Sequence, residues 1–346
     1  MLPIGVNRRE YGMKVIIQIP CFNEEAALPV TCAELPRSLP GVDRVEWLVI
    51  DDGSTDRTVE VARACGVDHV VVLPAHQGLA KAFMAGLDAA LRAGADIIVN
   101  TDADNQYCAA DIEKLVAPIL ARRAQIVIGA RPIDNIDHFS RTKKLLQKLG
   151  SWVVRATSGT TVQDAPSGFR AFSREAAMQL NVFNGYTYTL ETIIQAGQRG
   201  IATLSVPVRV NGDLRPSRLV KSIGTYVTRS LLVILRIFSI YRPLRWFLLV
   251  GGVPVTLGML LGVRWLILFA IEEGPTYHIP SLILAAVLLL MGFLIWVVGM
   301  IADLISVNRV LLEEIRYRLR QAELRQAEMQ ASARRPLGRG GADRAA

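Results

Sequence analysis

The sequence is short of the motifs by which several common enzyme classes are recognised. GxSxG, GxxxxGK[ST] and GxGxxG patterns are missing, which argues against hydrolase, kinase and dinucleotide-binding functions. Four histidines and four cysteines occur among 346 residues, without CxxC or other metal-ligand spacing. We interpret the cysteines as reduced thiols that are buried or half-buried; they are Cys21, Cys32, Cys65 and Cys108.

The N-terminus and the basic residues narrow the range of partners. The first fourteen residues contain no apolar stretch like that of a signal peptide, so we expect the first domain to stay in the cytoplasm. The formal net charge is +8, but no zinc-finger, RNP or helix-turn-helix pattern accompanies it, and we expect no nucleic-acid partner. Eight basic residues and one acid lie between Arg209 and Arg245, directly before an apolar run. This pattern indicates a membrane surface, with lipid headgroups or a lipid phosphate as the partner.

Short β-rich runs alternate with helical patterns over residues 14–210. The predicted strands are residues 14–20, 46–51, 69–74, 96–102 and 125–130, and the predicted helices are residues 24–35, 55–64, 79–93 and 111–122. Several of these strands are apolar at consecutive positions, as strands covered on both faces are. The pattern predicts an α/β domain with a mostly parallel, Rossmann-like sheet, in which ligands bind at the carboxyl ends of the strands.

Two long apolar runs follow, at residues 246–271 and 281–302. Each is long enough to cross a hydrocarbon layer of about 30 Å as a helix. The loop between them is short and acidic and the flanks are basic, so the positive-inside rule predicts two spans in the inner (cytoplasmic) membrane with both termini in the cytoplasm.

These patterns divide the chain into six parts. They are an N-terminal extension (1–13), the α/β domain (14–212), a juxtamembrane region with an interfacial amphipathic helix (213–243), a transmembrane hairpin (244–304), a C-terminal helix (305–333) and a disordered tail (334–346).

Oxygen-bearing side chains alternate after the predicted strand at 96–102. In an extended backbone, residues two apart face the same way, so Asp102, Asp104 and Gln106 could converge on a hard cation. Mg²⁺ or Mn²⁺ suits such ligands and would keep positions open for diphosphate oxygens. The same acidic residues could equally solvate a loop or cap the helix predicted to begin near Asp111.

A second acidic cluster, Asp51 and Asp52 in DDGSTD, follows the predicted strand at 46–51. Two adjacent carboxylates cost free energy unless donor groups face them. The ribose hydroxyls and base edge of a nucleoside would supply such donors, so this cluster favours a nucleotide site.

Five segments occur in the following order along the chain: IPCFNEE (19–25), DDGSTD (51–56), HQGLAKAFMAG (76–86), DADNQY (102–107) and PSGFRAFSREA (166–176). Together they resemble family 2 glycosyltransferases of the GT-A fold. They resemble more closely the branch of dolichol-phosphate mannose synthases and polyprenyl-phosphate glycosyltransferases. The resemblance extends over roughly residues 14–320, because the paired C-terminal spans also look like those of membrane-anchored bacterial members.

The resemblance implies roles for individual residues. The nucleotide would be bound by Pro20, Asn23, Glu24, Asp51, Asp52 and Asp102. The metal would be bound by Asp102, Asp104 and Gln106, and the catalytic residues would be Asp102, Asp104 and Arg131. The acceptor phosphate would be bound by Arg131, Arg141, Arg170, Arg215, Arg218 and Lys221. His76 and Lys81 depart from the family pattern and receive no catalytic role, and Glu191 could reach the acceptor or line the core.

The implied reaction is inverting, metal-dependent transfer of a sugar from a nucleotide-diphosphate sugar to a polyprenyl phosphate. A phosphate acceptor is ionised near neutral pH, so it needs no general base. Two alternatives stay open: transfer to a hydroxyl of another lipid or glycan, and a non-catalytic scaffold or carrier. The sugar is not readable from the sequence; a UDP-sugar is favoured over GDP-mannose, and the resemblance implies a homo-oligomer such as a tetramer.

Overall fold

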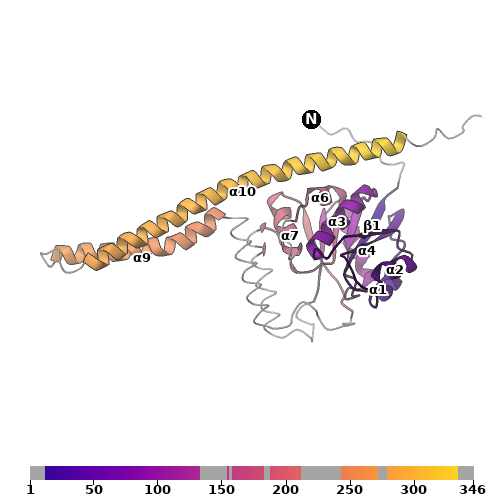
Figure 1. The fold of residues 1–346 in the computed structure, drawn as a ribbon, viewed down its shortest axis with the longest axis horizontal. Helices are drawn as coiled ribbons and strands as arrows, with labels where there is room; N and C mark the ends of the chain where they lie inside the picture. The colour runs from indigo at the N-terminus through magenta and orange to yellow at the C-terminus, as the bar shows by residue number, and fades with distance from the viewer. Residues whose placement is uncertain are drawn as a thin grey trace, which may run out of the picture. The chain divides into compact units, whose positions relative to one another are not determined.

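The computed structural model describes residues 12–132, 154–155, 158–182, 188–211, 243–271 and 279–333. Internal contacts divide the chain into two units (Figure 1). One unit comprises Met1–Lys221 with Glu314–Ala346, and the other comprises Ser222–Glu313. The first contains an α/β domain and the second contains a hairpin of two helices.

A seven-stranded sheet forms the centre of the α/β domain, in the order β3-β2-β1-β4-β6-β5-β7. The strands are β1 (Lys14–Cys21), β2 (Arg44–Asp51), β3 (His69–Val72), β4 (Ile97–Asn100), β5 (Ile126–Ala130), β6 (Arg170–Ser173) and β7 (Thr203–Pro207). β6 runs antiparallel to β4 and β5, whereas the other pairs are parallel. The structure therefore confirms the predicted α/β fold with a mostly parallel sheet.

Helices connect and cover the strands. They are α1 (Leu28–Glu34), α2 (Thr58–Ala64), α3 (Leu79–Arg92), α4 (Ile112–Leu120), α6 (Arg174–Gln179) and α7 (Thr189–Gln198), with a 3₁₀ turn η2 (Ala109–Asp111) before α4. All seven residues from Val15 to Cys21 in β1 are buried, which is what a strand with helices on both faces requires. The four cysteines form no disulfide; Cys21 and Cys32 are buried and the other two are half-buried, as predicted.

The second unit contains α9 (Pro243–Ile271) and the first part of α10 (Ile279–Ala333). Both helices are long and apolar enough to cross a membrane. They pack through small residues: a Cβ on Gly251 would lie 2.6 Å from the Trp296 ring, and one on Gly292 would lie 2.4 Å from Val255. Such close backbone approach is typical of helix pairs in lipid. α10 is continuous through the predicted boundary at 304/305, so the second span and the C-terminal helix form one element.

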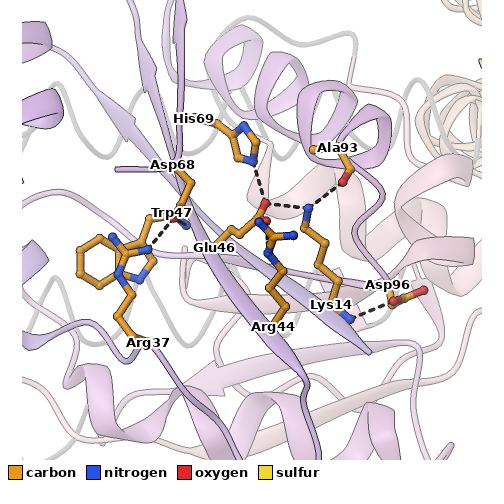
Figure 2. Close-up of polar contacts among 9 residues, drawn as sticks. All are labelled: Lys14, Arg37, Arg44, Glu46, Trp47, Asp68, His69, Ala93 and Asp96. Atoms are coloured by element: carbon orange, nitrogen blue, oxygen red, sulfur yellow. Dashed lines mark hydrogen bonds and ion pairs between the residues drawn. The ribbon is translucent and has the colours of Figure 1, made fainter. Parts of the chain in front are cut away.

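The amino ends of β1, β2 and β3 are joined around one buried carboxylate, that of Glu46 (Figure 2). Glu46 accepts from Lys14 Nζ at 2.7 Å, Arg44 Nε at 2.6 Å and His69 Nε2 at 2.7 Å. Burial alone would raise the pKa of Glu46, but the hydrogen bonds from Lys14 and His69 outweigh it and leave the pKa lowered. This cluster lies at the amino ends of the strands, whereas ligands are expected at their carboxyl ends.

The Glu46 cluster makes stability depend on pH. Because the pKa of Glu46 is lowered on folding, its charge stabilises the domain above its ordinary value of 4.5 and this contribution is lost as the pH falls through the folded-state pKa. We expect Glu46→Gln to destabilise the full-length protein by about 2 kcal/mol near neutral pH. Thermal unfolding in detergent measures the effect, with Glu113→Gln, an exposed residue of α4, as the control. A difference between Glu46→Gln and the parent that does not shrink in acid would contradict this account.

Candidate active site

Three neighbouring strands bring their following loops to one edge of the sheet. β1 lies between β2 and β4, and the register pairs Cys21 with Asp51 and Gln18 with Asn100. All three strands are parallel, so the loops at residues 22–27, 52–57 and 101–108 begin side by side. Most of the residues predicted to bind nucleotide and metal lie on these loops.

The loops after β1 and β2 are tied together by hydrogen bonds. Asn23, in a left-handed conformation with φ 54°, donates its N–H to Ser54 Oγ at 2.9 Å and accepts from Thr55 N–H at 2.8 Å. The N–H of Glu24 donates to Thr58 Oγ1 at 2.8 Å. Asn23 therefore shapes the loops, and its side-chain oxygen is already engaged by the neighbouring backbone.

Asp51 presents an acceptor oxygen that the described part of the chain does not engage. The residue is 2% exposed, and its Oδ2 accepts from the N–H of Ser54 at 3.2 Å. Its Oδ1 is buried, and no hydrogen-bond donor in the described part of the chain reaches it. A buried carboxylate oxygen without a partner is costly, so this position suits a ligand that supplies a hydroxyl or N–H donor.

Asp52, in contrast, is fully engaged by the protein. Its carboxylate accepts from the N–H groups of Gln77 and Gly78, each at 2.8 Å, and contacts His76 Nδ1 at 2.8 Å. The His76 ring also stacks on Phe22, with 3.9 Å between centroids. The geometry makes Asp52 an anchor for the loop that follows β3. The sequence did not indicate this role, because adjacent Asp51 and Asp52 look alike until the loop after β3 is placed against one of them.

The loop after β4 carries Asp102, Asp104 and Gln106, but it is not extended. β4 ends at Asn100, Ala103 and Asp104 form a turn, and Asn105 has φ 57°. The prediction that an extended backbone would turn Asp102, Asp104 and Gln106 to the same side was therefore wrong about the backbone conformation. The three side chains are nevertheless each half-buried, while Ala103, Asn105 and Tyr107 between and beside them are buried.

The donor set at this loop fits a divalent cation. Burial, followed by the charge of Asp104, raises the pKa of Asp102 to about 7, as expected for a carboxylate near a second carboxylate. A cation between them would relieve that repulsion. No three His, Cys, Asp or Glu side chains gather into a metal site within the described residues. Two carboxylates, the Gln106 amide and ligand phosphates form the kind of sparse set that Mg²⁺ accepts.

Arg131 faces this loop and is held by a residue that the sequence did not single out. Its Nε and Nη2 donate to the two carboxylate oxygens of Asp164 at 2.7 and 3.1 Å, and its N–H donates to the same carboxylate at 3.2 Å. Burial alone would lower the pKa of Arg131, but the Tyr107 and Asp164 oxygens outweigh it and raise the pKa. Asp164 lies two residues before the PSGFR segment, and this position next to a family motif was the only feature of the sequence that could have indicated a role in the site.

The PSGFR segment (residues 166–170) contacts β4 and the loop that follows it. The N–H of Gly168 donates to the Tyr107 hydroxyl at 3.1 Å, and its carbonyl accepts from Asn100 Nδ2 at 2.9 Å. A Cβ on Gly168 would lie 3.1 Å from both carboxylate oxygens of Asp102. Because Gly168 has no side chain, the segment can approach the loop that carries Asp102 this closely.

Arg170, predicted to bind the acceptor phosphate, is buried and hydrogen-bonded within the domain. It is 0% exposed and donates to the carbonyls of Ser167, Ala165 and Thr189 and to the Thr192 hydroxyl, each at 2.7 Å. Burial lowers its pKa to about 10. These bonds use the guanidinium to join the segment before β6 to α7, and the contact of Arg170 with an acceptor phosphate stays a prediction. Glu191, on α7, is 8% exposed.

The remaining predicted residues divide into two groups. Pro20 is buried in β1 and Glu24 is 8% exposed beside the acidic loop. The predicted acceptor-site residues Arg141, Arg215, Arg218 and Lys221 lie outside the described residues.

Comparison with known proteins identifies the class to which this fold and site belong. The sequence profile of glycosyl transferase family 2 matches residues 16–180. An uncharacterised glycosyltransferase of Mycobacterium tuberculosis is 32% identical over 219 residues, which cover 60% of this chain and 94% of that protein. The chain belongs to glycosyl transferase family 2.

Two further relatives narrow the comparison. An undecaprenyl-phosphate mannosyltransferase of Micrococcus luteus is 28% identical over 218 residues, covering 60% of this chain and 88% of that protein. A crystal structure of glucosyl-3-phosphoglycerate synthase from Mycobacterium tuberculosis with Mn²⁺, UDP and glucosyl-3-phosphoglycerate superposes with a TM-score of 0.51 at 25% identity. That match covers 66% of this chain and 79% of the other. These similarities confirm the resemblance to the polyprenyl-phosphate branch and to the GT-A fold.

The Arg131–Asp164 pair gives the first test of the site. We expect Asp164→Asn to lower sugar transfer by at least about 100-fold, because a misplaced guanidinium at the acidic loop disturbs the reacting groups. Asp68→Asn is the matched control, since Asp68 forms an ion pair with Arg37 at the opposite end of the sheet. Transfer rates and thermal unfolding would be measured for both variants. Equal losses of transfer in the two variants would mean that Asp164 only stabilises the fold.

Proposed function

We propose that the protein transfers a sugar from a nucleotide-diphosphate sugar to a polyprenyl phosphate, with a divalent cation and with inversion at the sugar carbon. The observation that carries the proposal is the pairing of two features at one sheet edge. One is the buried Oδ1 of Asp51, for which the described residues supply no hydrogen-bond donor, and the other is the loop with Asp102 and Asp104, where the charge of Asp104 raises the pKa of Asp102. The first suits a nucleoside and the second suits a metal-bound diphosphate.

The donor would lie across the carboxyl ends of β2, β1 and β4. Asp51 Oδ1 would accept from a ribose hydroxyl or a base N–H, and the Asn23–Ser54 contacts would hold the two loops that flank it. Asp102, Asp104 and Gln106 would hold Mg²⁺ or Mn²⁺. When bound, that cation would neutralise charge on the departing diphosphate.

The acceptor phosphate would be held by basic side chains. A phosphate monoester oxygen attacks the anomeric carbon, the bond from that carbon to the nucleotide diphosphate breaks, and the diphosphate leaves with the bonding electrons. Because the acceptor is already anionic, the protein must place two anions close together without strong repulsion. Among the described residues, Arg131, which is fixed by Asp164, is proposed to hold the acceptor phosphate. The phosphate site is proposed to be completed by Arg141, Arg215, Arg218 and Lys221.

Membrane attachment fits this acceptor. The hairpin of α9 and α10 is proposed to anchor the protein in the inner membrane, with the catalytic domain and both termini on the cytoplasmic side. The Micrococcus luteus relative is named for an undecaprenyl-phosphate acceptor, which favours polyprenyl phosphate over a lipid hydroxyl. UDP in the glucosyl-3-phosphoglycerate synthase structure favours a UDP-sugar over GDP-mannose. A homo-oligomer, such as a tetramer, is part of the same proposal.

Asp51 gives a direct test of nucleotide binding. We expect Asp51→Asn to weaken UDP binding by at least about 10-fold, because it removes the charge from a buried hydrogen-bond acceptor. Calorimetric titration of the full-length protein in detergent, with Mn²⁺ present, measures this. Asp68→Asn should bind UDP as the parent does. Unchanged affinity in Asp51→Asn would remove Asp51 from the nucleotide site.

Asp104 tests the metal and the acceptor together. We expect Asp104→Ala and EDTA each to abolish transfer of radiolabelled sugar from nucleotide sugars to undecaprenyl phosphate, while membrane insertion of the variant stays intact. Undecaprenol and diacylglycerol serve as hydroxyl acceptors in the same screen. Retained turnover in Asp104→Ala would exclude the metal role, and product formed only with a hydroxyl acceptor would exclude the phosphate acceptor.

A further inference from the structure

A segment far along the chain lies against the loop that carries the proposed metal ligands. After β7 the chain forms an antiparallel bridge between Val210 and Tyr107. The N–H of Asn211 donates to the Gln106 carbonyl at 2.8 Å, and the N–H of Cys108 donates to the Arg209 carbonyl at 3.3 Å. Residues 209–211 thus run beside the loop at residues 101–108, which carries Asp102, Asp104 and Gln106.

The Asn211 side chain adds a contact at the most irregular point of this loop. Its Nδ2 donates to the Asn105 carbonyl at 3.1 Å, and Asn105 is the residue with φ 57°. The left-handed conformation is rare outside glycine, so an outside donor on that carbonyl helps to keep it. The same Nδ2 also lies 3.3 Å from Glu34 Oε2, which ties the segment to α1.

Arg209 fixes the far end of the loop. Its N–H donates to Asp111 Oδ2 at 2.7 Å, and its Nη2 donates to Oδ1 at 2.7 Å. Asp111 is 0% exposed, and Lys114 Nζ contacts it at 2.9 Å. Burial alone would raise the pKa of Asp111, but hydrogen bonds from Arg209 and Lys114 outweigh it and lower the pKa to about 2. The carboxylate therefore remains ionised and paired.

We propose that Arg209 and Asn211 are positioning residues that hold the loop with Asp102, Asp104 and Gln106 in the conformation that binds a divalent cation. This inference rests on the proposed function for the identity of the ligand. The two residues act on the loop backbone at Asn105 and Gln106 and on the Asp111 carboxylate. They belong to a part of the sequence about one hundred positions away from the loop.

A fold-stabilising role is the competing explanation, and the variants separate the two. Asn211→Ala removes the side-chain bond to Asn105 but leaves the Arg209–Asp111 pair. Arg209→Gln removes that pair, and Arg209→Lys restores its charge. Arg37→Gln is the matched control, because it breaks another Arg–Asp pair of the same domain at the opposite end of the sheet.

Two readouts on the full-length protein in detergent test the proposal. In hydrogen exchange without metal, we expect the amides of residues 102–108 to exchange at least about 5-fold faster in Asn211→Ala and Arg209→Gln than in the parent and in Arg37→Gln. In titrations of free Mn²⁺ followed by its paramagnetic resonance signal with UDP present, we expect the two variants to need about 5- to 10-fold more Mn²⁺ for half saturation. Arg209→Lys should recover part of the loss.

The outcomes distinguish this inference from the proposed function. Loop exchange and Mn²⁺ affinity equal to the parent in both variants would overturn the positioning role. Loss of Mn²⁺ affinity in Arg37→Gln to the same degree would also overturn it, because general destabilisation would then explain the effect. A parent that binds no Mn²⁺ in the presence of UDP would overturn the proposed metal site, even if the variants loosen the loop.

Discussion

The placement of carboxylates at the ends of parallel strands is the constraint on which the rest of the site depends. β2, β1 and β4 lie side by side and point the same way, so the residues that follow them meet at one edge. Asp51 and Asp102 are brought together there although they are far apart in sequence. Buried anions at such an edge are unfavourable unless something compensates them, and the surrounding residues differ in whether they supply that compensation.

Within the described residues, some of these acids are compensated by donor groups and others are not. Asp52 is paired with loop N–H groups and His76, Asp164 with Arg131, and Asp111 with Arg209. Asp51 Oδ1 has no donor within the described residues, and Asp102 has a pKa raised to about 7 by burial and by Asp104. The unbalanced acids are those facing the proposed donor site. This division is what the proposed binding of a nucleotide with a cation requires of a stable domain.

The sequence predicted the sheet and the helices that alternate with it, because consecutive apolar residues and helical periodicity are local signals. It missed β6 and β7, since the four residues of β6 begin with a buried arginine and the half-buried β7, TLSVP, contains two hydroxyl residues and ends at a proline. It predicted Asp51 and Asp102 as ligand-binding residues from their place at the ends of strands. It could not separate Asp51 from Asp52, or find Asp164 as the partner of Arg131, because those roles depend on contacts between distant loops. That Arg170 is buried with its guanidinium donating to carbonyls could not be predicted from the sequence for the same reason.

A structure of the full-length protein with UDP and Mn²⁺ tests the central claim most directly. The account predicts a uridine hydroxyl or base N–H within hydrogen-bond distance of Asp51 Oδ1, and a metal ion bound by Asp102 or Asp104 that also contacts the diphosphate. A nucleotide bound away from these carboxylates, or a metal ion bound elsewhere, would contradict it.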